Sequence, residues 1–250
     1  MSPRFPLKKV QTPSLKQDLV YEQLKQAILY ADYQPGEVLS IRVLAAALGT
    51  STMPVRGAVS RLVAEGALEA LPNRGLRIPV LTRDQATDIF QVRTTLEGLA
   101  AALAAEVITE AEIAELEGYE RAIESAVRKR RIAEAVKYNL KFHIGICRAS
   151  RSVTTVALVE ALYLRYSPMM FNAVRALLAK KAGGSSLVIR RHHQQILDGL
   201  RRHDPIRTRR ALENDLNETL ALEGFHNSAY FPTGGPERVV RKRKVVRRSR

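Results

Sequence analysis

Two histidines, one asparagine and one aspartate combine the side-chain chemistry and the spacing that suit a divalent metal ion. Asn139 and His143 are four residues apart, so both would project from one face of a helix. His193 and Asp215 lie on two later segments with apolar neighbours. If the three helices face one cavity, imidazole, carboxylate and amide donors meet there, a set that suits Zn²⁺, Ni²⁺ or Mn²⁺. Spacing alone leaves open that His143 is a hydrogen-bonded core histidine.

The adjacent histidines at 192 and 193 cannot both point into one cavity. Neighbouring helix residues project about 100° apart, and Ile196 shares the side of His193, so His193 rather than His192 is assigned to the candidate site. Cys147 lies one turn after His143 and is interpreted as a packing residue. Because Cys147 is the single cysteine, an internal disulfide or a thiolate zinc cluster is excluded.

Arg93 is expected beside an apolar helical stripe, where a guanidinium needs an anion. The stripe consists of Ile89, Val92 and Leu96. Spacing makes Glu97, one turn further along the helix, one candidate partner for Arg93. The other is the carboxylate of a bound small acid, which the resemblance described below favours. Arg165 and Asn172 are further candidates for lining the cavity that would hold this acid.

A second group of polar and basic side chains suits duplex DNA. Ser51, Thr52 and Arg56 fall on the outer face of a helix that the sequence predicts between Ser51 and Gly66. A helix fits the major groove, where Arg56 can bind guanine or a phosphate and Thr52 can meet a phosphate or a thymine methyl. Arg42 on the preceding helix can hold the DNA backbone, and Arg74 is placed to enter a minor groove. Each residue taken singly is also compatible with an ordinary solvated surface.

The elements that would position these DNA-facing residues follow from apolar spacing and turn residues. Helical spacing from Leu19 to Ile28 ends before the turn Gln34-Pro35-Gly36. A short helix follows Leu39 with Ser40 as its cap, and Ser51 or Thr52 caps the next helix. Two extended runs, Ala67–Leu71 and Leu76–Val80, flank a turn and predict a hairpin. The second helix is expected to bury Val43, Leu44, Ala47 and Leu48. Three helices followed by a hairpin predict a winged helix-turn-helix.

After Thr82 every segment has a helical pattern. Thr82 with Gln85, and Thr109 with Glu112, match the capping box, and Pro168 should bend the helix that contains it. The predicted helices are 82–107, 110–130, 132–149, 153–179, 186–203 and 205–224. The expected fold is therefore mainly α-helical, with an N-terminal winged helix-turn-helix and a C-terminal antiparallel helical bundle.

The expected organisation has four parts. These are a flexible arm at 1–15, a DNA-binding domain at 16–81, a helical effector-binding and dimerisation domain at 82–230, and a basic disordered tail at 231–250. The tail is either an arm that binds DNA without sequence preference or a solubilising extension.

Composition narrows the class of protein further. The net charge is +15, and the last fifteen residues carry eight of the 40 Lys and Arg, so the excess positive charge is uneven. A basic chain of 250 residues suits a polyanionic partner. The chain has no apolar run long enough to span a membrane and its start does not resemble a secretory signal, so we expect a cytoplasmic protein with no membrane partner.

The N-terminal segment resembles the DNA-binding domain of GntR-family transcription regulators. The matching elements are I-x5-QPGE-x-LS, LA-x2-LGTS, PVR-x-AV-x-RL-x2-EG and PNRG, over about sixty residues in the order of the family. The resemblance implies that Arg42, Thr52, Arg56 and the wing residues Asn73, Arg74 and Gly75 contact an operator. The family usually has Arg at the position of Thr52 and often Glu at that of Gly57, so a different operator preference is expected.

Residues 83–224 resemble the helical ligand-sensing domain of the FadR subgroup, called FCD. The matching elements are Arg93-x3-Glu97, Asn139-x2-Phe142-His143, the run LYLRYSP, His193-x2-Ile196-Leu197 and Ala211-x3-Asp215. In this family an Asp or Asn and three histidines often hold a metal, and a small carboxylate effector completes its shell. Asn139, His143 and His193 match three of these positions, while Asp215 stands where the fourth has histidine.

The resemblance implies a homodimeric regulator that binds a palindromic DNA operator and responds to a small organic acid held by Arg93. Effector binding would reorient the helix at 82–107, which continues from the wing, and so change the spacing of two DNA-binding domains. An acyl-CoA-like ligand without metal is an alternative. A metal-dependent hydrolase or lyase is a further alternative, which the absence of H-E-x-x-H, a nucleophile elbow or a phosphate loop disfavours.

Overall fold

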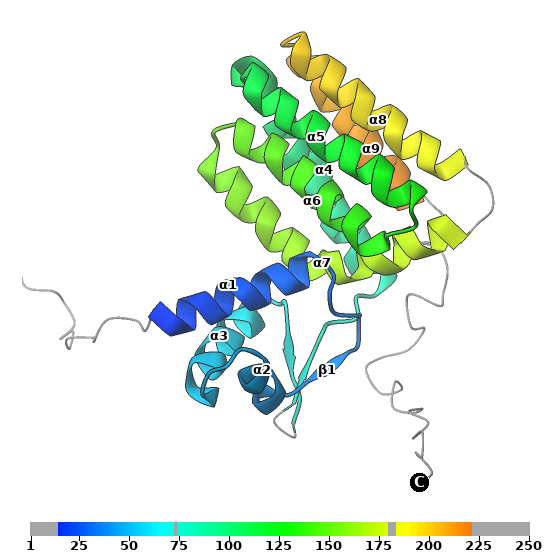
Figure 1. Cartoon of the computed structure of the whole chain (residues 1–250). Coiled ribbons are helices and arrows are strands. Elements are labelled where there is room, and N and C mark those ends of the chain that lie inside the picture. The colour runs from blue at the N-terminus through cyan, green and yellow to red at the C-terminus, as the bar shows by residue number, and fades with distance from the viewer. Residues whose placement is uncertain (1–14, 73–74, 180–183, 222–250) are drawn as a thin grey trace, which may run out of the picture.

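The N-terminal unit consists of three helices and a small sheet. In the computed structural model, which describes residues 15–72, 75–179 and 184–221, the helices are α1 (Leu15–Leu29), α2 (Ile41–Ala47) and α3 (Thr52–Ala64). The strands β1 (Val38–Leu39), β2 (Glu69–Ala70) and β3 (Leu76–Arg77) pair antiparallel in the order β1-β3-β2. Leu76 lies opposite both Leu39 and Ala70. This is the predicted winged helix-turn-helix (Figure 1).

Two glycines end the helices of the helix-turn-helix. Gly49 (φ 61°) follows α2 and Gly66 (φ 72°) follows α3, both in the left-handed region that glycine adopts without strain. After α3, the Ala67 amide donates to the Leu62 carbonyl at 2.9 Å and the Gly66 amide donates to the Val63 carbonyl at 3.0 Å. This Schellman pattern stops the helix and turns the chain toward the wing.

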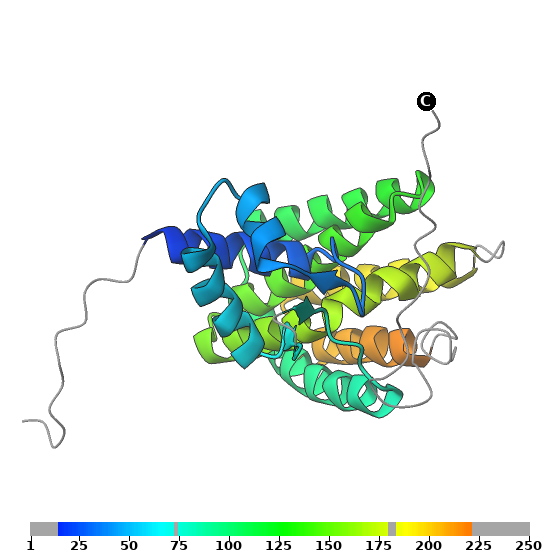
Figure 2. The same ribbon diagram turned by 90° about the horizontal axis from the view of Figure 1, so that it is seen from below.

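The helical unit contains six helices in the part of the chain that the structure describes. They are α4 (Arg83–Val107), α5 (Glu110–Arg128), α6 (Ile132–Ala149), α7 (Val153–Ala179), α8 (Gly184–Arg201) and α9 (Pro205–Ala221). The bundle lies above the N-terminal unit in Figure 1, and Figure 2 shows the same two units from below. The mainly helical fold predicted from the sequence is confirmed. Pro168 lies inside α7, which changes direction along its length in Figure 1.

Helix α7 belongs to the bundle but also completes the core of the N-terminal unit. Leu164 on α7 is buried in the same apolar cluster as Leu24 and Ile28 of α1 and Leu62 of α3. Beside this cluster, the Lys25 ammonium on α1 forms an ion pair with Glu160 on α7 at 3.3 Å. The two units therefore share side-chain packing instead of being joined by a linker alone.

Several local predictions were wrong for physical reasons that the structure shows. Ser40 and Ser51 occupy N-cap positions, but neither side chain makes a capping hydrogen bond. Helix α2 begins at Ile41 after its N-cap Ser40, as predicted, but the sequence did not predict that Leu39 pairs with β3 in the strand β1. Val43 (67% exposed) points outward because the buried side of α2 is formed by Leu44 and Ala45.

Some residues expected to be buried are exposed, and other predictions concern residues that the structure does not describe. Ala47 and Val92 are exposed, although both were expected in buried stripes. The arm at 1–14, the wing residues Asn73 and Arg74, and the segment 222–250, which includes the tail, lie outside the described residues.

Both capping boxes are present as predicted. At α5, the Glu112 amide donates to the Thr109 hydroxyl at 3.3 Å, and the Thr109 amide donates to the Glu112 carboxylate at 3.0 Å. Arg151 also donates two hydrogen bonds to this carboxylate. Its hydrogen bonds, led by those from Arg151, lower the pKa of Glu112 to about 2.

We expect Glu112→Gln to lower the free energy of unfolding at pH 7 by about 0.5–1 kcal/mol, because it removes the charge that pairs with Arg151, while glutamine can still close the capping box. Because the pKa of Glu112 is lower in the folded chain, the stabilisation is present above pH 4.5 and disappears as the pH falls toward 2. Urea unfolding followed by circular dichroism at pH 7, 4.5 and 3 measures the difference from wild type. Glu110→Gln removes an acidic residue from the same first turn and serves as the control. A difference that does not shrink at pH 3 would contradict this account.

Candidate metal centre and nucleic-acid interface

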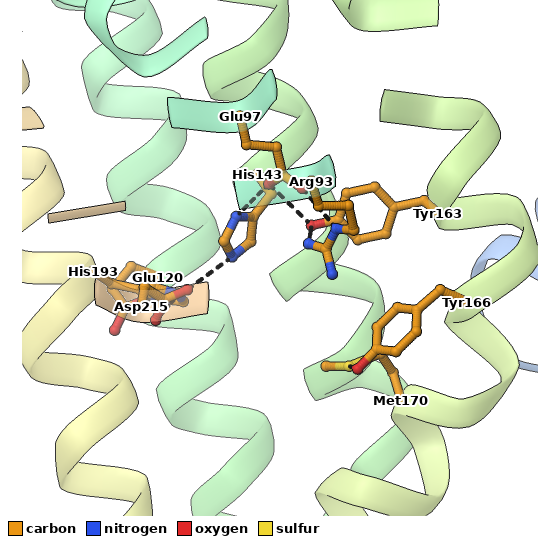
Figure 3. A network of polar contacts seen from close by, with 9 residues as sticks. All are labelled: Arg93, Glu97, Glu120, His143, Tyr163, Tyr166, Met170, His193 and Asp215. Carbon is orange, nitrogen blue, oxygen red and sulfur yellow. Dashed lines mark hydrogen bonds and ion pairs between the residues drawn. The ribbon is translucent and has the colours of Figure 1, made fainter. Parts of the chain in front are cut away.

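The side chains of His143, His193 and Asp215 converge inside the helical unit. They come from α6, α8 and α9, and one donor atom of each lies within 4.8 Å of the others. All three side chains are buried. Figure 3 shows them with the residues that they contact. The structure therefore brings together three of the four residues proposed from the sequence as metal ligands.

Two buried glutamates fix the orientation of the imidazoles. The Glu97 carboxylate of α4 lies 3.0 Å from His143 Nδ1, and the Glu120 carboxylate of α5 lies 2.5 Å from His193 Nδ1. Each Nδ1 is thereby occupied, and each Nε2 is directed toward Asp215. Carboxylates that hold the far nitrogen of a histidine in this way are typical second-layer partners of metal-binding histidines.

Two donor atoms at the point of convergence have no hydrogen-bond partner. They are His193 Nε2 and Asp215 Oδ1, which are both buried and lie 3.8 Å apart. Neither atom has a hydrogen-bond partner among the described residues. His143 Nε2 lies 3.4 Å from Asp215 Oδ2. A buried polar atom without a partner is costly and rare, so this donor set fits a divalent cation bound by two imidazoles and a carboxylate.

The charges around this point are also unbalanced. Glu97, Glu120 and Asp215 are all buried, while Arg93 is the buried arginine beside them. With three carboxylates ionised and both imidazoles neutral, the cluster carries two net negative charges, which one divalent cation would balance. Without a cation, a proton on His143 reduces the imbalance. Burial opposes this charge, but the hydrogen bonds that the imidazolium donates to Asp215 and Glu97 outweigh burial and raise the pKa of His143 to about 9.

The Arg93 guanidinium forms hydrogen bonds and an ion pair with other residues of the chain. Its Nε donates to Glu97 at 2.7 Å, its Nη2 donates to the Tyr163 hydroxyl, and its guanidinium lies 4.1 Å from the centre of the Tyr163 ring. The alternative that the sequence left open, an ion pair with Glu97, is therefore the one that the structure contains. Glu97 contacts both Arg93 and His143, so it joins the arginine to the histidine cluster (Figure 3).

The remaining predicted ligand-site residues lie in different places. Asn139 is half-buried on α6, one turn before His143. Arg165 was expected to line the helical cavity, but it is exposed and lies against Gly66 of the N-terminal unit, so that expectation was wrong. The physical reason is that α7 contacts both units, and Arg165 falls on the side that faces the first. Asn172 lies on α7, and its side chain is outside the described part of the structure.

Sequence reasoning missed Glu120. It assigned His193 to the site correctly but did not predict that His192 is buried as well. Glu120 is 3% exposed on α5, and its place in the apolar spacing of that helix, between Leu116 and Ile123, was the signal that could have predicted its burial. His192 and His193 are both buried, but His192 contacts Glu218 and only His193 reaches the cluster. Cys147 is buried, and burial raises the pKa of its thiol.

Three of the predicted DNA-facing residues are exposed on the helix-turn-helix. Arg42 on α2 and Arg56 on α3 are exposed, as is Ser51 at the N-cap of α3, while Thr52 is half-buried. Gly75, at the start of β3, is also half-buried. The opposite side of α3 packs into the core through Val55, Ala58, Val59 and Leu62. A recognition helix must leave one face free in this way to enter a major groove.

These features define a two-domain regulator that binds DNA, and comparison with known proteins identifies its family. Residues 16–78 match the gntR family of bacterial regulatory proteins, and residues 88–218 match the FCD domain. The chain therefore belongs to the GntR family of transcription regulators and carries an FCD domain. The family and the relatives below are transcription regulators, which confirms the prediction of a regulator instead of an enzyme.

Individual relatives agree with this assignment. The chain is 31% identical over 149 residues to the HTH-type transcriptional regulator McbR of Escherichia coli, covering 60% of this chain and 67% of that protein. It is 33% identical over 127 residues to the uncharacterized HTH-type transcriptional regulator YdhC of Bacillus subtilis, covering 49% and 55%. The solved structure of E. coli McbR/YncC superposes with a TM-score of 0.76 at 25% identity, covering 84% of this chain and 97% of that one.

The bundle helices are not membrane spans. None of the helices in the described residues combines the length and the apolar character needed to cross a bilayer.

The raised pKa of His143 predicts how stability depends on pH in the presence of a chelator. A histidine whose pKa is higher in the folded chain stabilises fully below its unfolded value, near 6.5, and the stabilisation is lost as the pH rises to about 9. We expect wild type to lose stability between pH 6.5 and 9 in urea titrations with EDTA. His143→Gln should lack that part of the pH dependence, and His192→Gln should keep it. A His143→Gln protein with the wild-type pH dependence would contradict this assignment.

Proposed function

We propose that this chain is a ligand-responsive DNA-binding regulator whose sensing site is the cluster His143, His193 and Asp215. In this proposal the cluster holds a divalent cation such as Zn²⁺, Ni²⁺ or Mn²⁺, and a small carboxylate effector binds beside it. The observation that carries the proposal is the pair of unpartnered buried atoms, His193 Nε2 and Asp215 Oδ1, aimed at one point with His143 Nε2. When bound, the cation supplies a Lewis-acid centre with coordination positions open to a carboxylate.

The residues around the cluster hold the donors in place. Glu97 and Glu120 keep each imidazole in the tautomer whose Nε2 lone pair is free to bind a cation, since each carboxylate accepts a hydrogen bond from Nδ1–H. Asn139, one turn before His143, is the candidate for an additional amide donor. The polar and charged character of this cluster favours a small acid over the acyl-CoA-like ligand, which would need a long apolar cavity.

Two helices are placed to transmit a change at this site to the DNA-binding unit. Helix α4 carries Arg93 and Glu97 and begins directly after the wing. Helix α7 carries Tyr163, which hydrogen-bonds Arg93, and the next residue, Leu164, lies in the core of the DNA-binding unit. An effector that changes the partners of Glu97 would therefore act on both connections. Coupling of 1–3 kcal/mol, typical of allosteric proteins, changes operator affinity by about 5–150-fold.

On the DNA side, the proposal assigns operator contacts to the outer face of α2 and α3 and to the wing. The assigned residues are Arg42, Ser51, Thr52, Arg56, Asn73, Arg74 and Gly75. We further propose that the chain acts in the cytoplasm as a homodimer on a palindromic operator, because two-fold symmetry lets two recognition helices read two half-sites.

Removal of one cluster histidine should weaken cation binding. We expect wild-type protein to bind one equivalent of Zn²⁺, measured by calorimetry and by a thermal shift that EDTA reverses. His193→Gln should weaken this affinity at least tenfold. Mutation of a residue that only hydrogen-bonds a metal ligand typically lowers metal affinity by about 10–100-fold, and loss of a direct ligand should cost no less.

The adjacent His192→Gln is the matched control, since it replaces a buried histidine of the same helix that lies outside the cluster. It should bind Zn²⁺ as wild type does. Equal Zn²⁺ affinity in the two variants, or no stoichiometric binding by wild type, would contradict the proposed site.

Arg56→Ala should weaken operator binding by about 1–3 kcal/mol and relax the preference at one base pair, if Arg56 reads a base edge. The measurement is fluorescence anisotropy on a duplex that wild-type protein selects from a random pool, with single-base variants. Arg210→Ala removes an exposed arginine of α9 and controls for charge alone. Equal losses in the two variants would show that Arg56 contributes only net charge.

A further inference from the structure

A cleft of about 670 Å³ lies where the DNA-binding unit meets the helical bundle. It is lined by the end of α3 and the chain after it, by the connection from the wing to α4, and by one side chain of α7, that of Arg165. Its volume falls within the range of small-molecule sites, which occur preferentially between domains.

Arg165 is the uncompensated charge in this cleft. Among the described residues it forms no hydrogen bond or ion pair, and its side chain lies against Gly66, where an added Cβ would be 3.4 Å from Nε. The two carboxylates that also line the cleft are already engaged. Glu65 accepts hydrogen bonds from Tyr21 and Arg61, and Glu69 accepts two from Arg77. A guanidinium between two neutralised carboxylates gives the cleft a net preference for anions.

The rest of the lining exposes both polar and apolar surface to the cleft, and the polar share is the larger. Its apolar part is formed by Val63, Leu68, Pro79, Val80 and Leu81. We propose that this cleft is a second small-molecule site, separate from the histidine cluster, which takes an organic anion with an apolar body. Arg165 binds the anionic group and the apolar lining binds the body. A carboxylate, sulfonate or phosphate ester attached to a ring or a short chain has this chemistry.

Such a ligand would bridge the two units. Arg165 belongs to the bundle, whereas Val63 and Leu68 belong to the DNA-binding unit, so binding favours the arrangement in which both walls are in place. By linkage, a ligand that favours one arrangement changes operator affinity, and operator DNA changes the affinity for the ligand by the same factor. The cleft thus offers a route of regulation that does not pass through the histidine cluster.

Two dyes that differ mainly in one charged group test the proposal on the full-length protein. The probes are 1-anilinonaphthalene-8-sulfonate, an anion, and N-phenyl-1-naphthylamine, its uncharged counterpart, each titrated by fluorescence. We expect Arg165→Gln to weaken binding of the anion at least tenfold, as loss of a hydrogen bond to a charged group does, and to leave the neutral dye unchanged. Ala64→Phe, which fills the cleft, should weaken both.

Two control variants separate this site from the rest of the molecule. Arg210→Gln removes an exposed arginine of α9, and His193→Gln disrupts the histidine cluster; both should bind the anion as wild type does. Unchanged anion affinity in Arg165→Gln, equal losses in Arg165→Gln and Arg210→Gln, or no saturable binding by wild type would overturn the proposal. Loss of anion binding in His193→Gln alone would place the anion at the cluster, and would also overturn it. None of these outcomes depends on whether the cluster binds a cation.

Discussion

The arrangement of the helical bundle depends on two buried carboxylate–imidazole pairs, Glu97 with His143 and Glu120 with His193. Each pair joins two helices, so that α4 is tied to α6 and α5 to α8, and Asp215 adds α9 at the same point. Buried carboxylates are tolerated only when they are paired or bind a cation. Among the described residues of the bundle, buried carboxylates occur only in this cluster, which is why we interpret it as a functional site and not as part of an ordinary core.

The second constraint is that one helix belongs to both units. Tyr163 and Leu164 are neighbours on α7, yet Tyr163 contacts the arginine beside the cluster and Leu164 packs among the residues of the DNA-binding unit. With the Lys25–Glu160 ion pair, this packing makes the orientation of the DNA-binding unit depend on the position of α7. A change of the bundle core can therefore alter the geometry with which α3 meets DNA, without a separate mechanical element.

Much of the fold and part of the site could be predicted because the relevant signals are local. Capping boxes identify the starts of α4 and α5, and apolar periodicity locates α8 and the inward side of His193. The strand β1 could not be predicted, because a two-residue strand exists only through its pairing with β3. The role of Glu120 and the position of Arg165 depend on which helix packs against which, and periodicity along one helix carries no such information. Arg165 is the clearest example, because α7 packs against both the bundle and the DNA-binding unit, and the sequence does not show which of the two Arg165 faces.

The most direct test of the sensing account is a crystal structure of the full-length protein with Zn²⁺ and anomalous data at the zinc edge. We predict an anomalous peak about 2.0–2.2 Å from His143 Nε2, His193 Nε2 and an Asp215 oxygen, with Glu97 and Glu120 still on the two Nδ1 atoms. A map without a peak there, in which His193 Nε2 instead hydrogen-bonds Asp215 and completes the cluster, would contradict the account.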